Sequence, residues 1–146
     1  MNPLEASAAS KFQPAVRPGA RDSDHIAPDC AGMNFFEIDH QFRSLLPLYL
    51  TDREHAHFTP HFERMGEVAG GRLNDLAMAA DKQGPVLHPR DRFGRDQDWI
   101  EYSAAYREME RIAWGDFQMA AMAHRPGALD WPEVTPSPVK YAFQYM

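Results

Sequence analysis

The sequence predicts a mainly α-helical fold, a small helical bundle that carries one short β-hairpin. Two observations support this class. Apolar residues recur every three to four positions between Thr59 and Asp81 and again after Ser103, which is the spacing of one helix face. Between these stretches, Val86–His88 and Trp99–Tyr102 are short, β-prone segments on either side of a charged turn.

Residues 1–32 are expected to form a flexible, disordered tail. They are rich in Ala, Pro, Ser and Gly, and their few apolar residues show no period, so little burial could offset the entropy lost on ordering. Asp22, Asp24 and His25 could be read as a metal cluster, but isolated polar residues in such a tail are usually just solvated. The helical domain is therefore placed at residues 33–146.

A short helix is predicted to open the domain. Asp39 can cap it, and Pro47 should interrupt it, because a proline inside a helix removes an amide and crowds the preceding turn. This helix carries the apolar residues Phe42, Leu45, Leu46 and Leu48.

Two start signals precede the longest predicted helix. Thr51 and Glu54 fit a capping box, and Thr59 followed by Pro60 fits a second helix start. The pair Gly70–Gly71 lies inside the apolar pattern and costs about 1 kcal/mol per glycine relative to alanine. A helix that keeps its period through two glycines indicates close packing against a neighbour or else a break; we favour one long helix with a weak middle.

A basic and aromatic patch lies around the predicted turn of the hairpin. Such a patch could meet the phosphates of a CoA-type ligand or of nucleic acid. Nearby aspartates dilute its positive charge, so a salt-bridged hairpin is the preferred interpretation. The patch consists of Arg90, Arg92, Phe93, Arg95 and Trp99.

Shorter elements are predicted for the rest of the chain. Ser103 can cap a helix that breaks at Gly115–Asp116, and Phe117–His124 is expected to be a further helical run. Prolines in residues 125–138 predict a loop over the surface. The last helix, Val139–Met146, ends on apolar side chains inside a helical pattern, which we interpret as a truncated reading frame.

Three motifs in a fixed order carry a family resemblance. Asp-x-x-Gly-Arg-x-x-Asp begins at Asp91, Ile-x-Tyr-Ser-x-x-Tyr begins at Ile100, and Met-Glu-Arg-Ile-Ala-Trp-Gly begins at Met109. Together they resemble the N-terminal helical domain of acyl-CoA dehydrogenase-like flavoproteins, in particular the DNA-alkylation-response branch. The resemblance covers 34–146, and Val139–Phe143 is similar to the start of the helix that leads into the family's flavin-binding middle domain.

The resemblance implies an FAD-dependent oxidoreductase that oxidises the α,β bond of an acyl thioester such as an acyl-CoA. In that family a glutamate base removes the α-proton, FAD accepts the β-hydride, and the helical domain covers one side of the substrate. The resemblance also implies middle and C-terminal domains and a homo-oligomer. Because the base and the main flavin-binding segments would lie beyond Met146, no catalytic or cofactor-binding residue is assigned, and this stretch alone is expected to be inactive.

Candidate contacts with the acyl chain are Trp114, Met119 and Met122, which by the resemblance lie in the stretch that contributes to the substrate pocket. Flexible thioethers suit a pocket for an irregular alkyl chain. Ordinary helix core is the alternative role for each residue. For the whole chain, the alternative is a non-enzymatic helical module that binds a partner protein through uncovered apolar faces.

No metal site is predicted among the histidines. His57 and His61 lie one helical turn apart, with His55 nearby, and zinc sites use this spacing. Phe58, however, stands where a metalloprotease would need its glutamate base. Solvated helix histidines are therefore favoured.

Composition limits the class of partner. The net charge of −6 argues against nucleic acid or an anionic membrane as a partner, because both need a basic surface. The single cysteine, Cys30, permits no intramolecular disulfide, which fits a reducing compartment. No stretch has the length of a transmembrane helix or the apolar run of a signal peptide. A cytoplasmic protein is therefore expected.

Overall fold

The computed structural model confirms the predicted class, because it is mainly helical and carries one antiparallel hairpin. The structure describes residues 29–146. The predicted tail therefore falls outside the described residues as far as residue 28, and so do Asp22, Asp24 and His25. Cys30 and Gly32 already make backbone hydrogen bonds, to Met33 and Gly70 respectively.

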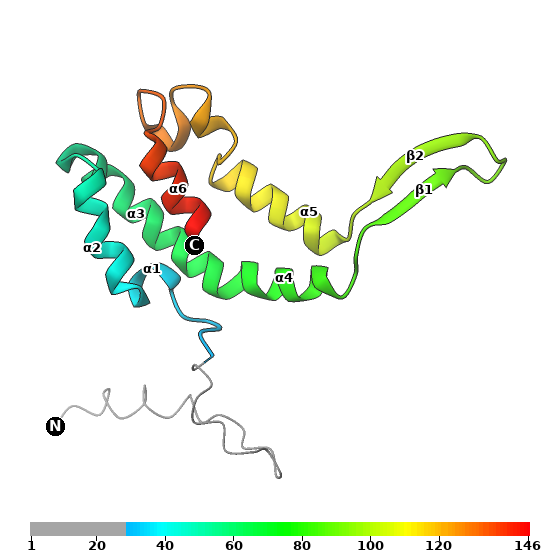
Figure 1. Cartoon of the computed structure of the whole chain (residues 1–146), viewed down its shortest axis with the longest axis horizontal. Helices are drawn as coiled ribbons and strands as arrows, with labels where there is room; N and C mark the ends of the chain where they lie inside the picture. The colour runs from blue at the N-terminus through cyan, green and yellow to red at the C-terminus, as the bar shows by residue number, and fades with distance from the viewer. Residues whose placement is uncertain (1–28) are drawn as a thin grey trace, which may run out of the picture.

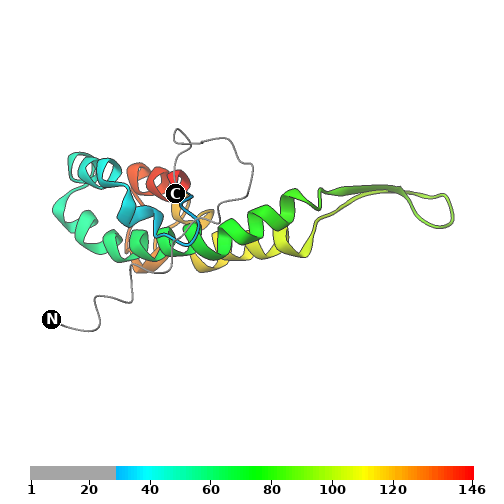
Figure 2. The same cartoon turned by 90° about the horizontal axis from the view of Figure 1, so that it is seen from below.

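The helices form a bundle at one end and a narrow two-helix neck at the other (Figure 1). α3 and α4 continue one another as a long rod, α5 runs back along α4, and the hairpin extends beyond both (Figures 1 and 2). The elements are α1 (Phe35–Ile38), α2 (His40–Tyr49), α3 (Asp52–Val68), the π-helical turn η1 (Ala69–Leu73), α4 (Asn74–Asp81), β1 (Val86–Arg90), β2 (Asp96–Glu101), α5 (Ala104–Glu110), the π-helical turn η2 (Arg111–Asp116), the 3₁₀ turns η3 (Ala121–Ala123) and η4 (Ala128–Asp130), and α6 (Ser137–Tyr145).

The capping box at the start of α3 is present, but the second helix start is not. The Thr51 side chain accepts a hydrogen bond from the Glu54 amide, and the Glu54 side chain accepts one from the Thr51 amide at 2.7 Å. α3 then continues through Pro60, and the Thr59 hydroxyl donates to the His55 carbonyl at 2.7 Å instead of capping a helix. The prediction of a second start was wrong because the buried stripe of α3 runs unbroken past the proline.

Buried aromatic rings hold the bundle together. The Phe62 ring lies 5.7 Å from that of Phe36 on α1 and 5.0 Å from that of Phe143 on α6. Phe143 in turn contacts Phe117, which follows η2. Since the rings come from segments far apart in sequence, this cluster fixes where α1 and α6 lie on α3.

The predicted close packing at the glycine pair is confirmed for one of the two residues. The rod passes through Gly70 in the turn η1 without a break. A Cβ atom on Gly70 would overlap the carbonyl oxygen of Met33, whereas one on Gly71 would meet nothing within 4 Å. The Gly32 amide also donates to the Gly70 carbonyl at 2.6 Å. The N-terminal segment therefore lies directly on the backbone of the rod.

The region after α5 differs from the prediction. Instead of a helix over Phe117–His124, the chain forms only η3, and Gln118 has a φ of 51°. A non-glycine residue in this left-handed region ends helical geometry. The following proline-rich segment is not a surface loop throughout, because Leu129 and Trp131 are buried against α3. Prolines exclude a helix there, but they do not say which side chains turn inward.

The two glycines of η1 give a matched test of packing. Gly70→Ala should lower the free energy of unfolding by about 1–3 kcal/mol, because the new methyl group displaces the Met33 backbone. Gly71→Ala should leave it unchanged or raise it by up to about 1 kcal/mol, since alanine is the better helix former. Urea unfolding followed by circular dichroism measures both. Equal effects of the two substitutions would refute the close approach of residues 32–33 to the rod.

The environment of Asp39 predicts how the free energy of unfolding changes at acid pH. The Phe42 amide and then the Tyr145 hydroxyl hydrogen-bond its carboxylate and hold the pKa of Asp39 below its usual 3.8. A lowered folded-state pKa gives stabilisation that is complete above pH 3.8 and is lost as the pH falls through the folded-state value. Asp39→Asn retains a capping oxygen but does not titrate. Between neutral pH and about pH 3, its unfolding free energy should fall less than that of the wild type. Urea unfolding at several pH values measures this, and equal acid sensitivity would contradict it.

Candidate functional site

A cavity of about 420 Å³ opens between α3, α4, α5 and α6. Four methionines from different segments line it, and we call it the methionine cavity: Met65, Met109, Met119 and Met146. Leu73 and Phe143 extend the apolar wall, and the polar side chains in the lining are those of Asn74 and Gln144. Among residues 29–146, no charged side chain lines it. An uncharged, flexible thioether wall fits an irregular apolar group better than a polar ligand.

The three predicted pocket residues lie in different surroundings. Met119 lines the methionine cavity. Met122 is 0% exposed and belongs to the hydrophobic core, which matches the alternative role considered for it. Trp114, on η2, is 59% exposed. The sequence did not single out Met65 and Met109, because each occupies an ordinary stripe position of its own helix. The recurrence of methionine on separate helices was the available signal.

A second hollow, which we call the apolar groove, runs between α2 and α6. It measures about 520 Å³ and is lined by Phe42, Leu45, Tyr49, Tyr141 and Tyr145, among others. Asp39 at its edge accepts a 2.7 Å hydrogen bond from the Tyr145 hydroxyl, which ties the two helices together. This groove could not be predicted from the sequence, because its two walls are separated by about ninety residues and neither wall alone is unusual.

His57 and His61 take part in packing. The Nε2 atom of His57 lies 2.9 Å from the Leu129 carbonyl oxygen, and because a carbonyl only accepts, Nε2 carries the proton and is not free to bind a metal. Burial lowers the pKa of His61, and the charges of His57 and Arg64 lower it further. Within the described residues 29–146, no group of three or more His, Cys, Asp or Glu side chains could hold a metal ion.

A polar network joins the two helices of the neck. Glu108 on α5 accepts hydrogen bonds from Arg72 on η1 and, at 2.9 Å, from Arg111 on η2. Arg111 also donates to Asp116 at 2.9 Å. The hydrogen bond from Arg111 is the main reason that the pKa of Glu108 is lowered. A carboxylate held ionised by two guanidinium groups is suited to fixing α5 on the rod and not to moving protons.

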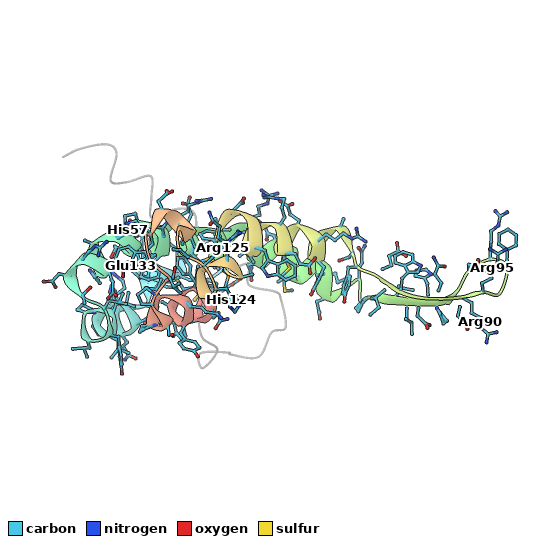
Figure 3. All side chains as sticks on the ribbon, turned by 90° about the horizontal axis from the view of Figure 1, so that it is seen from above. His57, Arg90, Arg95, His124, Arg125 and Glu133 are labelled. Carbon is cyan, nitrogen blue, oxygen red and sulfur yellow. The ribbon has the colours of Figure 1, made fainter. Side chains whose placement is uncertain are left out.

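The patch at the hairpin turn is partly neutralised. Arg90 pairs with Asp96 at 3.6 Å, which agrees with the predicted salt-bridged hairpin. Arg92 and Arg95 lie over the Phe93 ring, at 4.6 and 5.5 Å from its centroid. Figure 3 places Arg90 and Arg95 at the far end of the molecule from His57. The patch is therefore remote from both hollows of the helical body.

None of the helices within residues 29–146 has the length and apolarity needed to cross a bilayer.

Comparisons with known proteins agree with this fold. No curated protein matches the chain. A solved structure titled "Bd2924 apo-form" superposes with a TM-score of 0.63 at 26% identity, over 77% of this chain and 21% of that one. This chain thus corresponds to about a fifth of the length of that protein. A family model described as the adaptive response protein AidB N-terminal domain matches residues 26–135. Because that match covers most of the sequence, the chain belongs to the AidB N-terminal domain family, whose parent protein is an acyl-CoA dehydrogenase-like flavoprotein.

Proposed function

We propose that this chain acts as the N-terminal part of an FAD-dependent acyl-CoA dehydrogenase-like oxidoreductase, where it forms one wall of the site for an acyl thioester. The family match over residues 26–135 is the observation that carries the proposal. The methionine cavity supports it, because an uncharged wall of thioethers and aliphatic side chains suits an acyl chain.

Within this proposal the three predicted pocket residues have separate tasks. Met119 contacts the acyl chain, since it lines the methionine cavity. Met122, buried in the core, holds residues 117–124 in place behind that wall. Trp114 presents its exposed ring to a neighbouring domain or to the substrate.

FAD is the cofactor that the family suggests, and it would accept the hydride in the dehydrogenation. The methionine cavity does not fit its pyrophosphate, because no arginine or lysine of the described part of the chain lines the cavity. We therefore expect segments outside residues 29–146 to hold most of the flavin, and we assign no catalytic or cofactor-binding residue here. Those segments would keep the cofactor away from water and aligned with the substrate. The cofactor would supply the chemistry, and this chain would help to position the acyl group.

A second candidate function is a non-enzymatic helical module that docks on a partner protein. The apolar groove favours this second function, because the groove has a volume of about 520 Å³ and its walls include the exposed apolar side chains of Leu45, Tyr49 and Tyr141. The two candidates differ in a measurable way. The enzyme requires an acyl thioester to bind beside a flavin, whereas the module does not.

A chimaera tests the proposal. Residues 29–146 would replace the N-terminal domain of a family member that carries the flavin-binding domains, and acyl-CoAs of increasing chain length would be titrated while flavin absorbance is followed. Met119→Asp should weaken acyl-CoA binding roughly tenfold or more, because it buries a carboxylate against the alkyl chain. FAD content should stay unchanged. The matched control is Met78→Asp, an exposed methionine on α4 outside the cavity, which should bind as the parent does.

Two results would count against the proposal. If the chimaera holds FAD but no acyl-CoA perturbs it, the oxidoreductase function is wrong. If Met119→Asp and Met78→Asp behave alike while acyl-CoA still binds, the enzyme assignment stands but the methionine cavity is not its wall.

A further inference from the structure

The apolar groove combines four aromatic rings with a carboxylate. Phe42 and Tyr49 come from α2, whereas Tyr141 and Tyr145 come from α6. Asp39, the N-cap of α2, is the only charged residue of the described part of the chain that lines the groove. The groove has a volume of about 520 Å³, which is in the range of sites for small organic molecules.

The fold holds the acidic end of the groove in place. α2 and α6 run in opposite directions, so that the start of α2 meets the end of α6 (Figure 1). The Tyr145 hydroxyl donates to the Asp39 carboxylate at 2.7 Å, and the Phe42 amide donates to it at 2.8 Å. The Phe42 and Tyr145 ring centroids lie 4.7 Å apart. A carboxylate with two aromatic rings close by is therefore in position before any ligand binds.

No basic side chain of residues 29–146 forms an ion pair with this carboxylate. The hydrogen bond from the Phe42 amide, and then that from Tyr145, holds the pKa of Asp39 below its usual 3.8, so the carboxylate is ionised at neutral pH. His40 has only the weakest of the influences on that pKa, and with Arg43 it lines a different hollow, which borders α3. The groove thus presents a negative charge without a basic partner from the described residues.

The other end of the groove is apolar and open to solvent. Tyr49 and Tyr141 are largely exposed there, and neither makes a hydrogen bond or a ring-to-ring contact with another residue of 29–146. Both rings can therefore turn towards a bound molecule. Aromatic faces attract a cation that lies within about 6 Å of the ring centroid, and clusters of such rings recognise quaternary ammonium groups.

Other kinds of ligand match the groove less well. A CoA thioester carries phosphates, which the Asp39 carboxylate would repel. A partner surface without a positive charge would bury that carboxylate uncompensated, which is costly. Both Asp39 oxygens already accept a hydrogen bond, so the carboxylate needs an opposite charge more than a further donor. A quaternary ammonium group has a positive charge and no N–H group, and it meets both conditions.

We propose that the apolar groove is a binding site for a small organic cation, a quaternary ammonium group joined to an aliphatic or aromatic body. The ammonium group lies at Asp39, beside the ring of Tyr145. The body of the ligand extends along the groove towards Tyr49 and Tyr141. The proposal does not depend on the proposed enzymatic function. It also differs from the docking of a partner protein, because an apolar protein surface needs no ammonium group.

Titration of the isotope-labelled, complete 146-residue chain with benzyltrimethylammonium, followed by two-dimensional NMR, tests the site. Amide signals of α2 and α6 should shift and saturate. Dimethyl benzyl carbinol has nearly the same shape but no charge, and it should bind roughly fivefold or more weakly. Phenylacetate, an anion of similar size, should bind more weakly still. Equal affinity for the cation and the carbinol would make the groove a merely apolar surface, and that result, or shifts that never saturate, would overturn the proposal.

The carboxylate is tested by removing its charge. Asp39→Asn should weaken benzyltrimethylammonium binding roughly tenfold, because the charge is lost while a capping oxygen remains. Asp75→Asn makes the same change at an exposed carboxylate of α4 outside the groove, and it should have no effect. Circular dichroism checks that both variants are folded. Affinities that change equally in the two variants, or in neither, would show that the ammonium group does not lie at Asp39.

The aromatic contribution is tested by a change that keeps the side chain apolar. Tyr141→Leu should weaken benzyltrimethylammonium binding roughly threefold or more, but it should change the affinity for dimethyl benzyl carbinol much less, because only the cation is attracted to a ring face by its charge. Tyr106→Leu, at an exposed tyrosine of α5, is the matched control and should alter neither affinity. An equal loss for the two molecules would contradict recognition of the cation by the rings.

Discussion

The packing of α3 against rings from distant segments is the constraint on which the rest of the structure depends. Phe58 and Phe62 are completely buried on one side of α3. α1 supplies Phe36, α6 supplies Phe143, and the proline-rich segment supplies Trp131 to the same surface. All three rings pack on one continuous apolar stripe of α3. A break in the helix at this stripe would therefore remove their packing contacts. Burial of this size outweighs the single hydrogen bond that Pro60 removes, so α3 passes through the proline.

The two-helix neck that carries the β1–β2 hairpin is held differently, by polar contacts and by close approach of backbone segments. The Arg72–Glu108–Arg111 network joins the rod to α5, while Gly70 allows the N-terminal segment to lie on the rod's backbone. No side chain of α4 or α5 is fully buried. Exposed ion pairs contribute little each, so the neck is expected to open more readily than the bundle around α3. The hairpin follows α4 and precedes α5, so these two helices set its direction.

Features set by residues close together in the sequence could be predicted, whereas contacts between distant segments could not. The capping box of Thr51 and Glu54, the Asp39 cap and the hairpin depend on residues within a few positions of one another, and each is present. The start at Thr59, the helix after Phe117 and the surface loop before α6 failed, because distant packing decided them. The methionine cavity also depends on contacts between distant segments. The family resemblance pointed to Met119, but only the folded structure brings Met65 and Met109 beside it.

The apolar groove, the methionine cavity and the hairpin occupy different parts of the molecule. α2 and α6 lie at one end of the rod, and the hairpin extends from the other (Figure 1). The apolar groove is lined by residues of α2 and α6, whereas residues of α3, α4, α5 and α6 line the methionine cavity. Because the hydrogen bond from Tyr145 to Asp39 joins α6 to the start of α2, it holds the two walls of the apolar groove together.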